Sequence, residues 1–354
     1  MINENTVVKH YAILIGVDAY LSGPLTSCVR DIQMIQKCLE DKLGSVEHTL
    51  IASKSPDPEI ITPLEDPERW PTCYNVTSVF ERVTSQAKPK DYVYIHYSGH
   101  GTRLPPCFDL SNQSTGDLAL VLLEGDQSPE IFLRGPRLAR LLKEMVDKGL
   151  VLTLVLDCCF SATVYRNNGP GVRYLPYGLV AASTHSLDPK DIHIERSTHP
   201  TNRDVSMRDN WLLEPERYAI LAACGPDENA KGGSEKGLTY RALSYFLSRT
   251  LSDHGLGRKH KEIYRHIRAM FWDSSMVQHL VLYGNGGQSF FNPLKSHRGV
   301  RSIYIIKREG SLQLLAGEAH GLHDGDQFTV SPSGWTSGNG AKENYIAKSH
   351  VPRL

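Results

Sequence analysis

The feature of this chain that most constrains its fold is a series of short apolar runs, each closed by turn residues and followed by a helical pattern. Four full-length runs and two shorter ones lie at residues 11–17, 92–97, 150–156, 218–223, 49–52 and 118–123. Continuous apolar runs of this length, separated by helices, predict strands that are buried on both faces of a parallel sheet. Apolar residues recur at helical spacing within residues 25–43, 76–83, 138–145, 238–251 and 263–272. The alternation predicts an α/β sandwich with helices on both faces of the sheet.

Two regions depart from this alternation. Residues 185–216 are polar and irregular and contain three prolines. A loop of that length is unusual inside a compact domain, which indicates a functional or disordered segment. After about Pro293 the pattern changes to short strands and turns, typical of a small β module. We therefore expect a first domain over residues 1–295, containing this irregular loop, and a β-rich C-terminal module over residues 296–354.

Charge, hydropathy and cysteine content restrict the partners and the location. Basic and acidic side chains number 39 each, so the formal net charge is zero. Nucleic acids and anionic membranes require a basic face, so we expect neither as a partner. No apolar stretch approaches the ~18 residues needed to span a bilayer, and the first residues lack a signal-peptide pattern. The seven cysteines are irregularly spaced without a CxxC motif, which favours a reducing, cytoplasmic location.

Unusual residues follow two of the predicted strands. The run 92–97 leads into a glycine-flanked His100, and the run 150–156 leads into Cys159. Sites in open α/β sheets lie just beyond the carboxyl ends of the strands, so neighbouring strands would bring His100 and Cys159 together. A thiol needs an adjacent base to become a nucleophile, and backbone N–H groups of Gly101 and Cys159 are candidates for an oxyanion hole. On these residues alone, a structural role is an equally good interpretation.

The segments around these two residues resemble the signature segments of metacaspases, in the clan of caspases, legumain and separase. They read YSGHGT at residues 97–102 and LDCCFS at 156–161. The resemblance extends from Tyr11 to about Tyr283, and suggests a fungal-type or microbial member. It implies a caspase-like α/β/α sandwich around a mostly parallel six-stranded sheet. It also implies a cysteine endopeptidase that acts through a Cys159–His100 dyad and a thioester acyl-enzyme, without a required cofactor.

Two residues beside the expected dyad are predicted to lie in the core instead. Side chains at i and i+2 of an extended segment share a side, so Asp157 and Cys159 face the cleft while Cys158 faces inward. The spacing in the metacaspase family, a nucleophile two residues after an acidic residue, also selects Cys159. His96, four residues before His100, lies on a strand without the glutamate of the HExxH zinc motif, which favours a core histidine.

The resemblance also implies a substrate pocket. Metacaspases build it from positions that correspond here to Asp157, Ser98, Cys28 and Asp31. Carboxylates beside the cleaved bond favour an arginine or lysine side chain in a protein or peptide substrate. Taken alone, Asp31 is better interpreted as a solvated helix residue, and only the match at all four positions favours the pocket. Arg30 in the pocket would instead favour an acidic substrate side chain. Neighbouring helix residues point about 100° apart, so Arg30 and Asp31 cannot both line the pocket, and the match to the family favours Asp31.

Calcium activates many metacaspases through an acidic cluster ahead of the helix that precedes the nucleophile strand. In this chain Arg134 and Gly135 stand where carboxylates are expected. Asp117, Glu124 and Asp126 are close in sequence, and we interpret them as surface loop residues. A hard cation needs several oxygen ligands, and an arginine opposes it. We therefore expect no metal site and weak or absent calcium dependence.

Several alternatives stay open at the level of sequence. The irregular loop carries basic residues at Lys190, Arg196, Arg203 and Arg208. These suit self-cleavage of a zymogen, although an ordinary surface loop explains them equally well. The chain is alternatively a non-catalytic caspase-like scaffold, or a relative with non-basic specificity. A role in programmed cell death is an expectation from the family alone, and the partner of the β-rich module is unknown.

Overall fold

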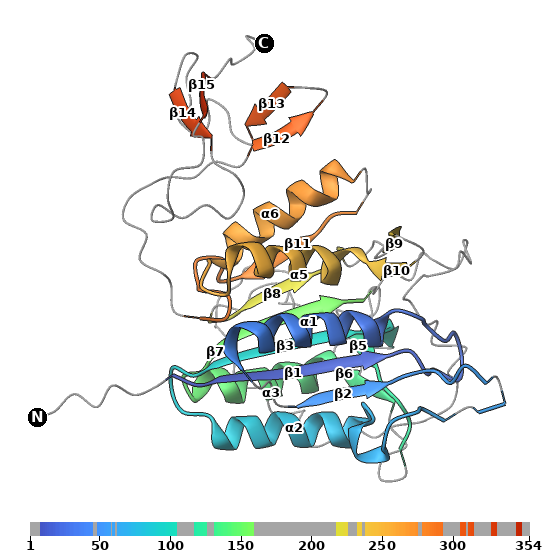
Figure 1. Cartoon of the computed structure of the whole chain (residues 1–354). Coiled ribbons are helices and arrows are strands. Elements are labelled where there is room, and N and C mark those ends of the chain that lie inside the picture. The colour runs from blue at the N-terminus through green and yellow to red at the C-terminus, as the bar shows by residue number, and fades with distance from the viewer. Residues whose placement is uncertain are drawn as a thin grey trace, which may run out of the picture.

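A six-stranded sheet forms the centre of the protein (Figure 1). The computed structural model describes residues 8–44, 48–57, 59–60, 62–104, 117–125, 131–158, 217–225, 232–235, 238–274, 278–292, 305–308, 311–314, 327–330 and 345–348. In spatial order the strands are β11 (Val281–Gly284), β8 (Ala219–Ala222), β7 (Val151–Asp157), β3 (Tyr92–Ser98), β1 (His10–Val17) and β2 (Thr49–Ala52). Every neighbouring pair is parallel except β11 with β8. The expected caspase-like α/β architecture, with a mostly parallel six-stranded sheet, is confirmed.

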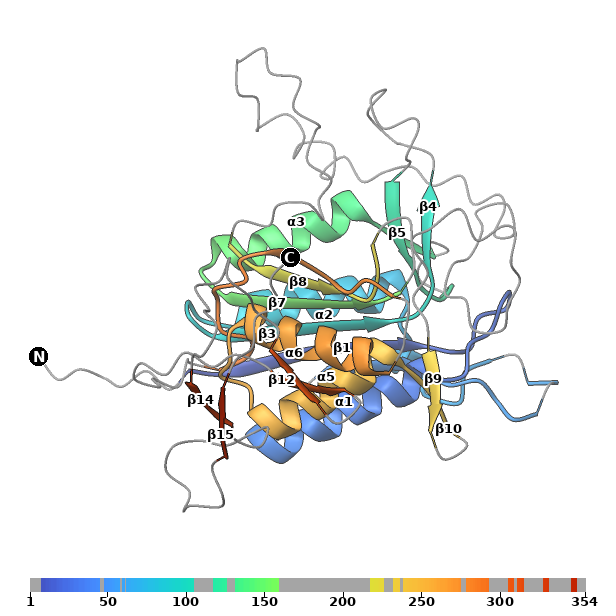
Figure 2. The same ribbon diagram turned by 90° about the horizontal axis from the view of Figure 1, so that it is seen from above.

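Helices cover both faces of this sheet (Figure 2). One face packs against α1 (Cys28–Leu43), α5 (Ala242–His254) and α6 (His260–Asp273), and the other against α2 (Cys73–Gln86) and α3 (Gly135–Asp147). Alternate residues of β1 enter the two cores, with Ile13 and Ile15 in one and Ala12 and Leu14 in the other. The strand is therefore apolar on both sides, which is why its sequence forms a continuous apolar run.

Smaller elements surround the sheet. An antiparallel sheet of β4 (Gly101–Leu104), β5 (Asp117–Val121) and β6 (Phe132–Arg134) follows β3, and a 3-10 turn (Pro67–Arg69) precedes α2. A hairpin of β9 (Gly232–Glu235) and β10 (Leu238–Arg241) leads directly into α5. The helix predicted over residues 238–251 is therefore wrong in its first four residues, because they pair with β9 instead. Pairing with another strand overrides local helical spacing.

The C-terminal region contains short antiparallel pairs. They are β12 (Ile305–Arg308) with β13 (Ser311–Leu314), and β14 (Gln327–Val330) with β15 (Tyr345–Lys348). These agree with the predicted change to short strands after about residue 293. The division into residues 1–295 and 296–354 stays a prediction, and the irregular loop at 185–216 lies outside the described residues.

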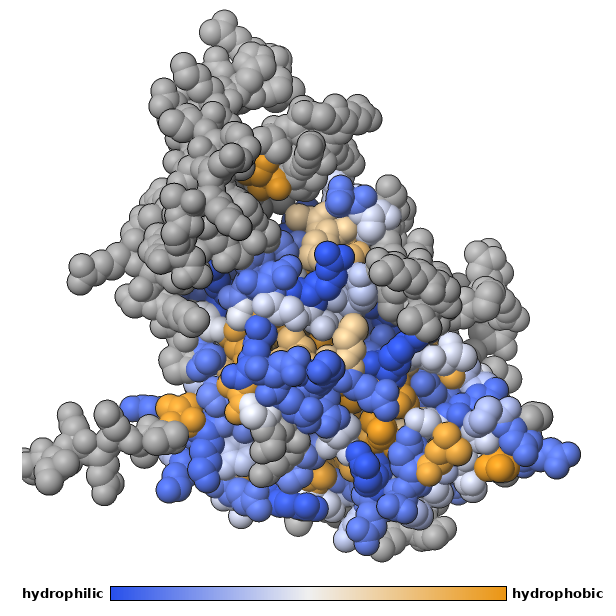
Figure 3. Space-filling model, viewed as in Figure 1, coloured by the Kyte–Doolittle hydropathy of each residue, from blue (hydrophilic) through white to orange (hydrophobic). Residues whose placement is uncertain are grey.

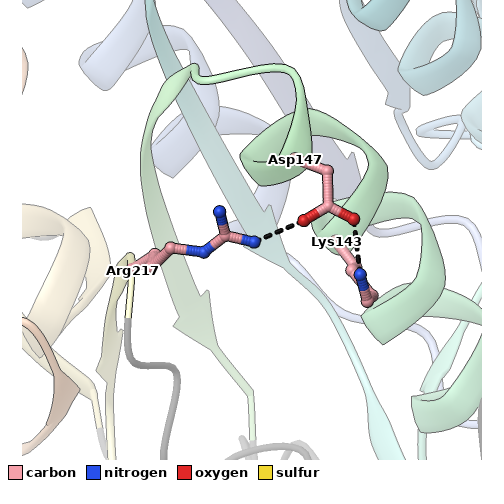
Figure 4. A network of polar contacts seen from close by, with 3 residues as sticks. All are labelled: Lys143, Asp147 and Arg217. Carbon is pink, nitrogen blue, oxygen red and sulfur yellow. Dashed lines mark hydrogen bonds and ion pairs between the residues drawn. The ribbon is translucent and has the colours of Figure 1, made fainter. Parts of the chain in front are cut away.

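An exposed ionic cluster joins the end of α3 to the segment that leads into β8 (Figure 4). Asp147 on α3 pairs with both Lys143 and Arg217. The hydrogen bond from Lys143 lowers the pKa of Asp147 most; burial opposes it, and the hydrogen bond from Arg217 adds a smaller lowering. Because all three side chains are largely exposed, solvent screening leaves these pairs a small contribution to stability.

The surface shown in Figure 3 is mainly hydrophilic. On the face shown in Figure 3, hydrophilic side chains predominate and apolar ones are scattered among them. Within the described segments, each helix is too short or too polar to span a lipid bilayer.

Candidate active site

The two strands that the sequence assigns to the site are neighbours in the sheet. β3 and β7 pair in parallel, with Ser98 opposite Asp157. Their carboxyl ends therefore lie at the same edge, as expected. His100 follows β3 by two residues, and Cys159 follows β7 by two residues but lies outside the described residues. The register brings the two strand ends together, and the contact between Cys159 and His100 stays a prediction.

The ring of His100 is fixed by the loop after β1. The side chain is only 2% exposed, and its Nε2 lies 2.6 Å from the carbonyl oxygen of Gly23. A carbonyl oxygen only accepts hydrogen bonds, so Nε2 carries the proton that is donated to it. In the neutral imidazole the lone pair is then on Nδ1. Nδ1 is the nitrogen able to accept a proton.

Two tyrosines hold the backbone of His100. Its N–H donates to the hydroxyl of Tyr20 at 2.9 Å, and its carbonyl accepts from the hydroxyl of Tyr97 at 2.6 Å. The Tyr20 ring also packs against the imidazole, with centroids 4.6 Å apart. Burial, reinforced by the neighbouring Tyr20, raises the pKa of Tyr97 well above its ordinary value. The Tyr97 hydroxyl therefore keeps its proton and remains a donor.

Gly99 makes this arrangement possible because it has no side chain. A Cβ at this position would lie 2.5 Å from the hydroxyl oxygens of both Tyr20 and Tyr97. That is well inside van der Waals contact, so another residue would displace the tyrosines that hold His100. The glycine before His100 is thus required by a close approach of side chains.

Two buried carboxylates lie beside the end of β3. Asp31 on α1 is 1% exposed, and its Oδ2 is 3.4 Å from the hydroxyl of Ser98, which donates to it. Asp157 is equally buried at the end of β7. We call Asp31 and Asp157 the acidic pair. The alternative interpretation of Asp31 as a solvated helix residue is wrong.

The start of α1 is anchored to the end of β1. The backbone N–H groups of Cys28 and Val29 donate to the two carboxylate oxygens of Asp18, at 2.9 and 3.3 Å. Asp18 thereby satisfies unpaired N–H groups of the first turn of α1. The Cys28 side chain is buried one turn before Asp31. All four residues expected in the pocket therefore lie on elements that meet at this edge of the sheet.

The acidic pair also receives donors from the start of α5. Ser244 donates both its N–H, at 3.1 Å, and its hydroxyl, at 2.6 Å, to Oδ2 of Asp157. The N–H of Arg241 donates to Oδ1 of Asp31 at 3.4 Å. Sequence reasoning missed both residues, since the predicted helix began at 238 and placed no helix start there.

The core positions predicted for Cys158 and His96 agree with the structure. Cys158 is buried, and its carbonyl accepts a contact from the Cys224 thiol at 3.7 Å, so its predicted core position is confirmed. His96 is fully buried between Tyr94 and Ser244, as expected for a core histidine. Gly101 begins β4, next to His100. Its role as an oxyanion donor stays a prediction.

The region expected to lack a calcium site contains an ion pair. Asp117 on β5 lies 3.6 Å from the guanidinium of Arg134 at the end of β6. Asp117 is therefore a largely buried strand residue, and its interpretation as a surface loop residue is wrong. Glu124 is exposed and Asp126 lies outside the described residues. Among described residues, no three histidine, cysteine, aspartate or glutamate side chains form a potential metal-binding group.

Comparison with known proteins finds similarity to metacaspases. Residues 10–167 match the family model of the metacaspase peptidase C14 domain. Metacaspase-7 of Arabidopsis thaliana is 29% identical over 151 residues, which cover 42% of this chain and 34% of that protein. Metacaspase-9 of the same plant is 23% identical over 330 residues, covering 80% of this chain and 96% of that protein. Metacaspase-1A of Aspergillus oryzae is 24% identical over 153 residues, covering 43% and 34%.

These comparisons differ in how much of each protein they include. For the first two plant relatives, the chain spans only about a third of their length, 34% and 36%. Among solved structures, protein GSU0716 from Geobacter sulfurreducens has a TM-score of 0.51 at 17% identity, covering 78% of this chain and 94% of that one. At that identity the likeness supports the fold alone.

Proposed function

We propose that the protein is a cysteine endopeptidase of the metacaspase family that cleaves after arginine or lysine. The match of residues 10–167 to the metacaspase peptidase C14 model, together with the similarity to plant and fungal metacaspases, supports the proposal. The observation that carries the specificity is the acidic pair, buried at the strand edge where His100 also lies. Two buried carboxylates are costly unless they are paired or hydrogen-bonded. The hydrogen bonds to Asp31 and Asp157 hold both carboxylates at this edge. Carboxylates in such a position favour a guanidinium or ammonium group of the substrate.

The proposed chemistry is acyl transfer. Nδ1 of His100 accepts the proton of the Cys159 thiol, and the hydrogen bond from Nε2 to the Gly23 carbonyl stabilises the resulting imidazolium. The thiolate attacks the peptide carbonyl carbon, and the N–H groups of Gly101 and Cys159 bind the oxyanion. The imidazolium returns its proton to the leaving amine as the C–N bond breaks. Water, deprotonated by His100, then hydrolyses the thioester and releases the acid and the thiol.

A panel of fluorogenic peptides that differ only in the residue before the cleaved bond tests this function. We expect turnover of the arginine and lysine peptides and none with the Cys159→Ala variant. Failure of every basic peptide, with cleavage after another residue, would contradict the pocket assignment and favour a relative with non-basic specificity. Absence of turnover together with no labelling by a basic peptidyl electrophile would indicate a non-catalytic scaffold.

We also propose that the enzyme needs neither calcium nor another cofactor. The guanidinium of Arg134 neutralises Asp117, so these residues do not fit a divalent cation. Activity measured in a chelator and then with added calcium decides the point, and equal rates are expected. Activity that appears only with calcium would contradict it.

Self-cleavage within residues 185–216 is the last part of the proposal. An enzyme specific for basic residues finds four candidate sites there, Lys190, Arg196, Arg203 and Arg208. Intact mass of the active protein should then be lower than that of Cys159→Ala produced in the same way, or show two fragments. Identical masses would mean that the segment is an ordinary loop. A cytoplasmic location and a role in cell death remain proposals from the family.

A further inference from the structure

A chain of hydrogen bonds runs from the acidic pair into the core. The hydroxyl of Ser244 lies 2.6 Å from Oδ2 of Asp157 and 3.1 Å from Nε2 of His96. The other ring nitrogen of His96 lies 2.8 Å from the Tyr94 hydroxyl. All four side chains are buried. The acyl-transfer mechanism uses none of the three residues behind Asp157.

The donors and acceptors of these hydrogen bonds follow from Asp157, the first residue of the series. An ionised carboxylate only accepts, so the single hydroxyl proton of Ser244 is donated to Asp157. The Ser244 oxygen then accepts from the Nε2–H of His96, which leaves Nδ1 to accept from the Tyr94 hydroxyl. Burial, and then nearby Cys38 and Asp157, raise the pKa of Tyr94 well above its ordinary value, so it keeps the proton to donate. Each donor therefore has an acceptor when Asp157 is ionised.

The start of α5 also donates to Asp31, the second carboxylate of the acidic pair. Arg241, three residues before Ser244, donates its N–H to Asp31. The start of α5 thus holds both members of the acidic pair, and Ser98 donates to Asp31 from the side of β3. Donors to buried carboxylates stabilise their ionised form before any substrate arrives.

We propose that Ser244 is a positioning residue that makes the site selective for a positively charged substrate side chain. The inference rests on the proposed function and deepens it. Two donors from Ser244 on one oxygen fix the orientation of the Asp157 carboxylate, and His96 fixes the hydroxyl of Ser244. A carboxylate that is already oriented binds a guanidinium without the entropic cost of ordering it. Ser244 itself does not touch the reacting atoms.

A purely structural role for Ser244 makes a different prediction. Its bonds to Asp157 also satisfy a donor in the first turn of α5, which stabilises the helix. If that were the whole role, removal of the hydroxyl would lower stability and affect all substrates equally. Selectivity between charged and neutral substrates therefore distinguishes the two roles.

The test uses the full chain and two peptides that are identical except for arginine or citrulline before the cleaved bond. Citrulline has nearly the shape of arginine but no charge, so the ratio of the two kcat/KM values reports recognition of charge. Ser244→Ala removes the hydroxyl, and Ser244→Cys is nearly isosteric with only a weak donor, which guards against misfolding. Ser248→Ala, at a buried serine one turn later on α5, is the matched control.

We expect the arginine-to-citrulline ratio to fall by roughly tenfold or more in both Ser244 variants, as for a lost hydrogen bond to a charged group. Turnover of the citrulline peptide and the ratio in Ser248→Ala should match the wild type. An unchanged ratio in the Ser244 variants, while the wild type prefers arginine, overturns the assignment and leaves the proposed function intact. No preference in the wild type overturns the proposed function and this inference with it.

Discussion

At the scale of single residues, His100 is held at the ring and on both sides of its backbone. Gly23 accepts from the ring, Tyr20 accepts from the backbone N–H, and Tyr97 donates to the carbonyl. Each contact is short, and the side chains involved are buried. In the proposed mechanism His100 is the general base, which must stay within hydrogen-bond reach of the proton that it accepts, so such support would affect the rate.

Removal of one hydroxyl tests this support. Tyr20→Phe leaves the buried N–H of His100 without its acceptor and keeps the ring that packs against the imidazole. We expect stability to fall by about 1–3 kcal/mol and kcat on an arginine peptide to fall roughly tenfold with little change in KM. The measurements are urea unfolding and steady-state kinetics.

A tyrosine at the start of β3 provides the control. The Tyr92 hydroxyl forms a buried hydrogen bond of 3.0 Å with Ser289, far along β3 from His100. Tyr92→Phe should lower stability comparably while kcat stays at the wild-type value. An equal loss of kcat in both variants would show that Tyr20 acts only through stability.

The sequence predicted the residues that follow strands and missed those that support them. His100 is predicted because the strand before it is visible as an apolar run, and the pocket positions Ser98 and Asp157 are implied by the resemblance to metacaspases. Gly23 and Tyr20 act on His100 across 77 and 80 residues of chain, and Ser244 acts on Asp157 across 87. Contacts over such separations depend on how the elements pack, which no local pattern encodes.

At the scale of elements, the start of α6 is tied to the sheet by a buried histidine. His260 places Nδ1 2.9 Å from the Gln288 carbonyl and Nε2 2.9 Å from the Thr153 hydroxyl on β7. Burial lowers the pKa of His260 to about 4, against a smaller opposing effect of the Gln288 hydrogen bond. Its ordinary pKa, 6.5, applies once the chain unfolds.

This difference between the folded and unfolded pKa of His260 predicts that the protein becomes less stable in acid. Between about pH 4 and pH 6.5 the unfolded chain binds more protons than the folded one, so stability falls as the pH falls through that window and is constant above it. For His260 alone the loss from roughly pH 7 to pH 5 is about 2 kcal/mol. Urea unfolding at several pH values measures it.

Two substitutions separate His260 from the other histidines. His260→Gln should reduce the pH dependence without abolishing it, because burial and then neighbouring His254 also lower the pKa of His266 to about 4. His279→Gln, at an exposed position, should leave the dependence as in the wild type. A His260→Gln protein with the full wild-type slope would contradict the assignment.

Elements also show where local patterns mislead. Apolar spacing placed residues 238–241 in a helix, yet they form β10 because β9 is available as a partner. In contrast, the continuous run of β3 was predicted because burial on both faces leaves no polar alternation.

At the scale of the whole molecule, a hydrophobic core covers each face of the sheet. One of these cores contains two adjacent aromatic residues near residue 291. Phe290 and Phe291 are each 1% exposed and pack against the Tyr94 ring on β3, with centroids 5.6 and 5.4 Å apart. They belong to the core that also contains α1, α5 and α6. The packing of this core therefore extends to residue 291, just before the predicted domain boundary at 295.

Two truncated chains test this boundary. A chain that ends at residue 295 retains both phenylalanines and should keep the unfolding transition and the kcat/KM of the full chain on an arginine peptide. A chain that ends at residue 286 loses both phenylalanines. It also loses Gln288, whose carbonyl accepts the hydrogen bond from His260. Loss of a buried phenylalanine costs about 3–5 kcal/mol, so loss of two approaches the 5–15 kcal/mol that holds a typical domain folded. We expect the shorter chain to be unfolded by circular dichroism, and a 295-residue chain without activity would place part of residues 296–354 in the catalytic unit.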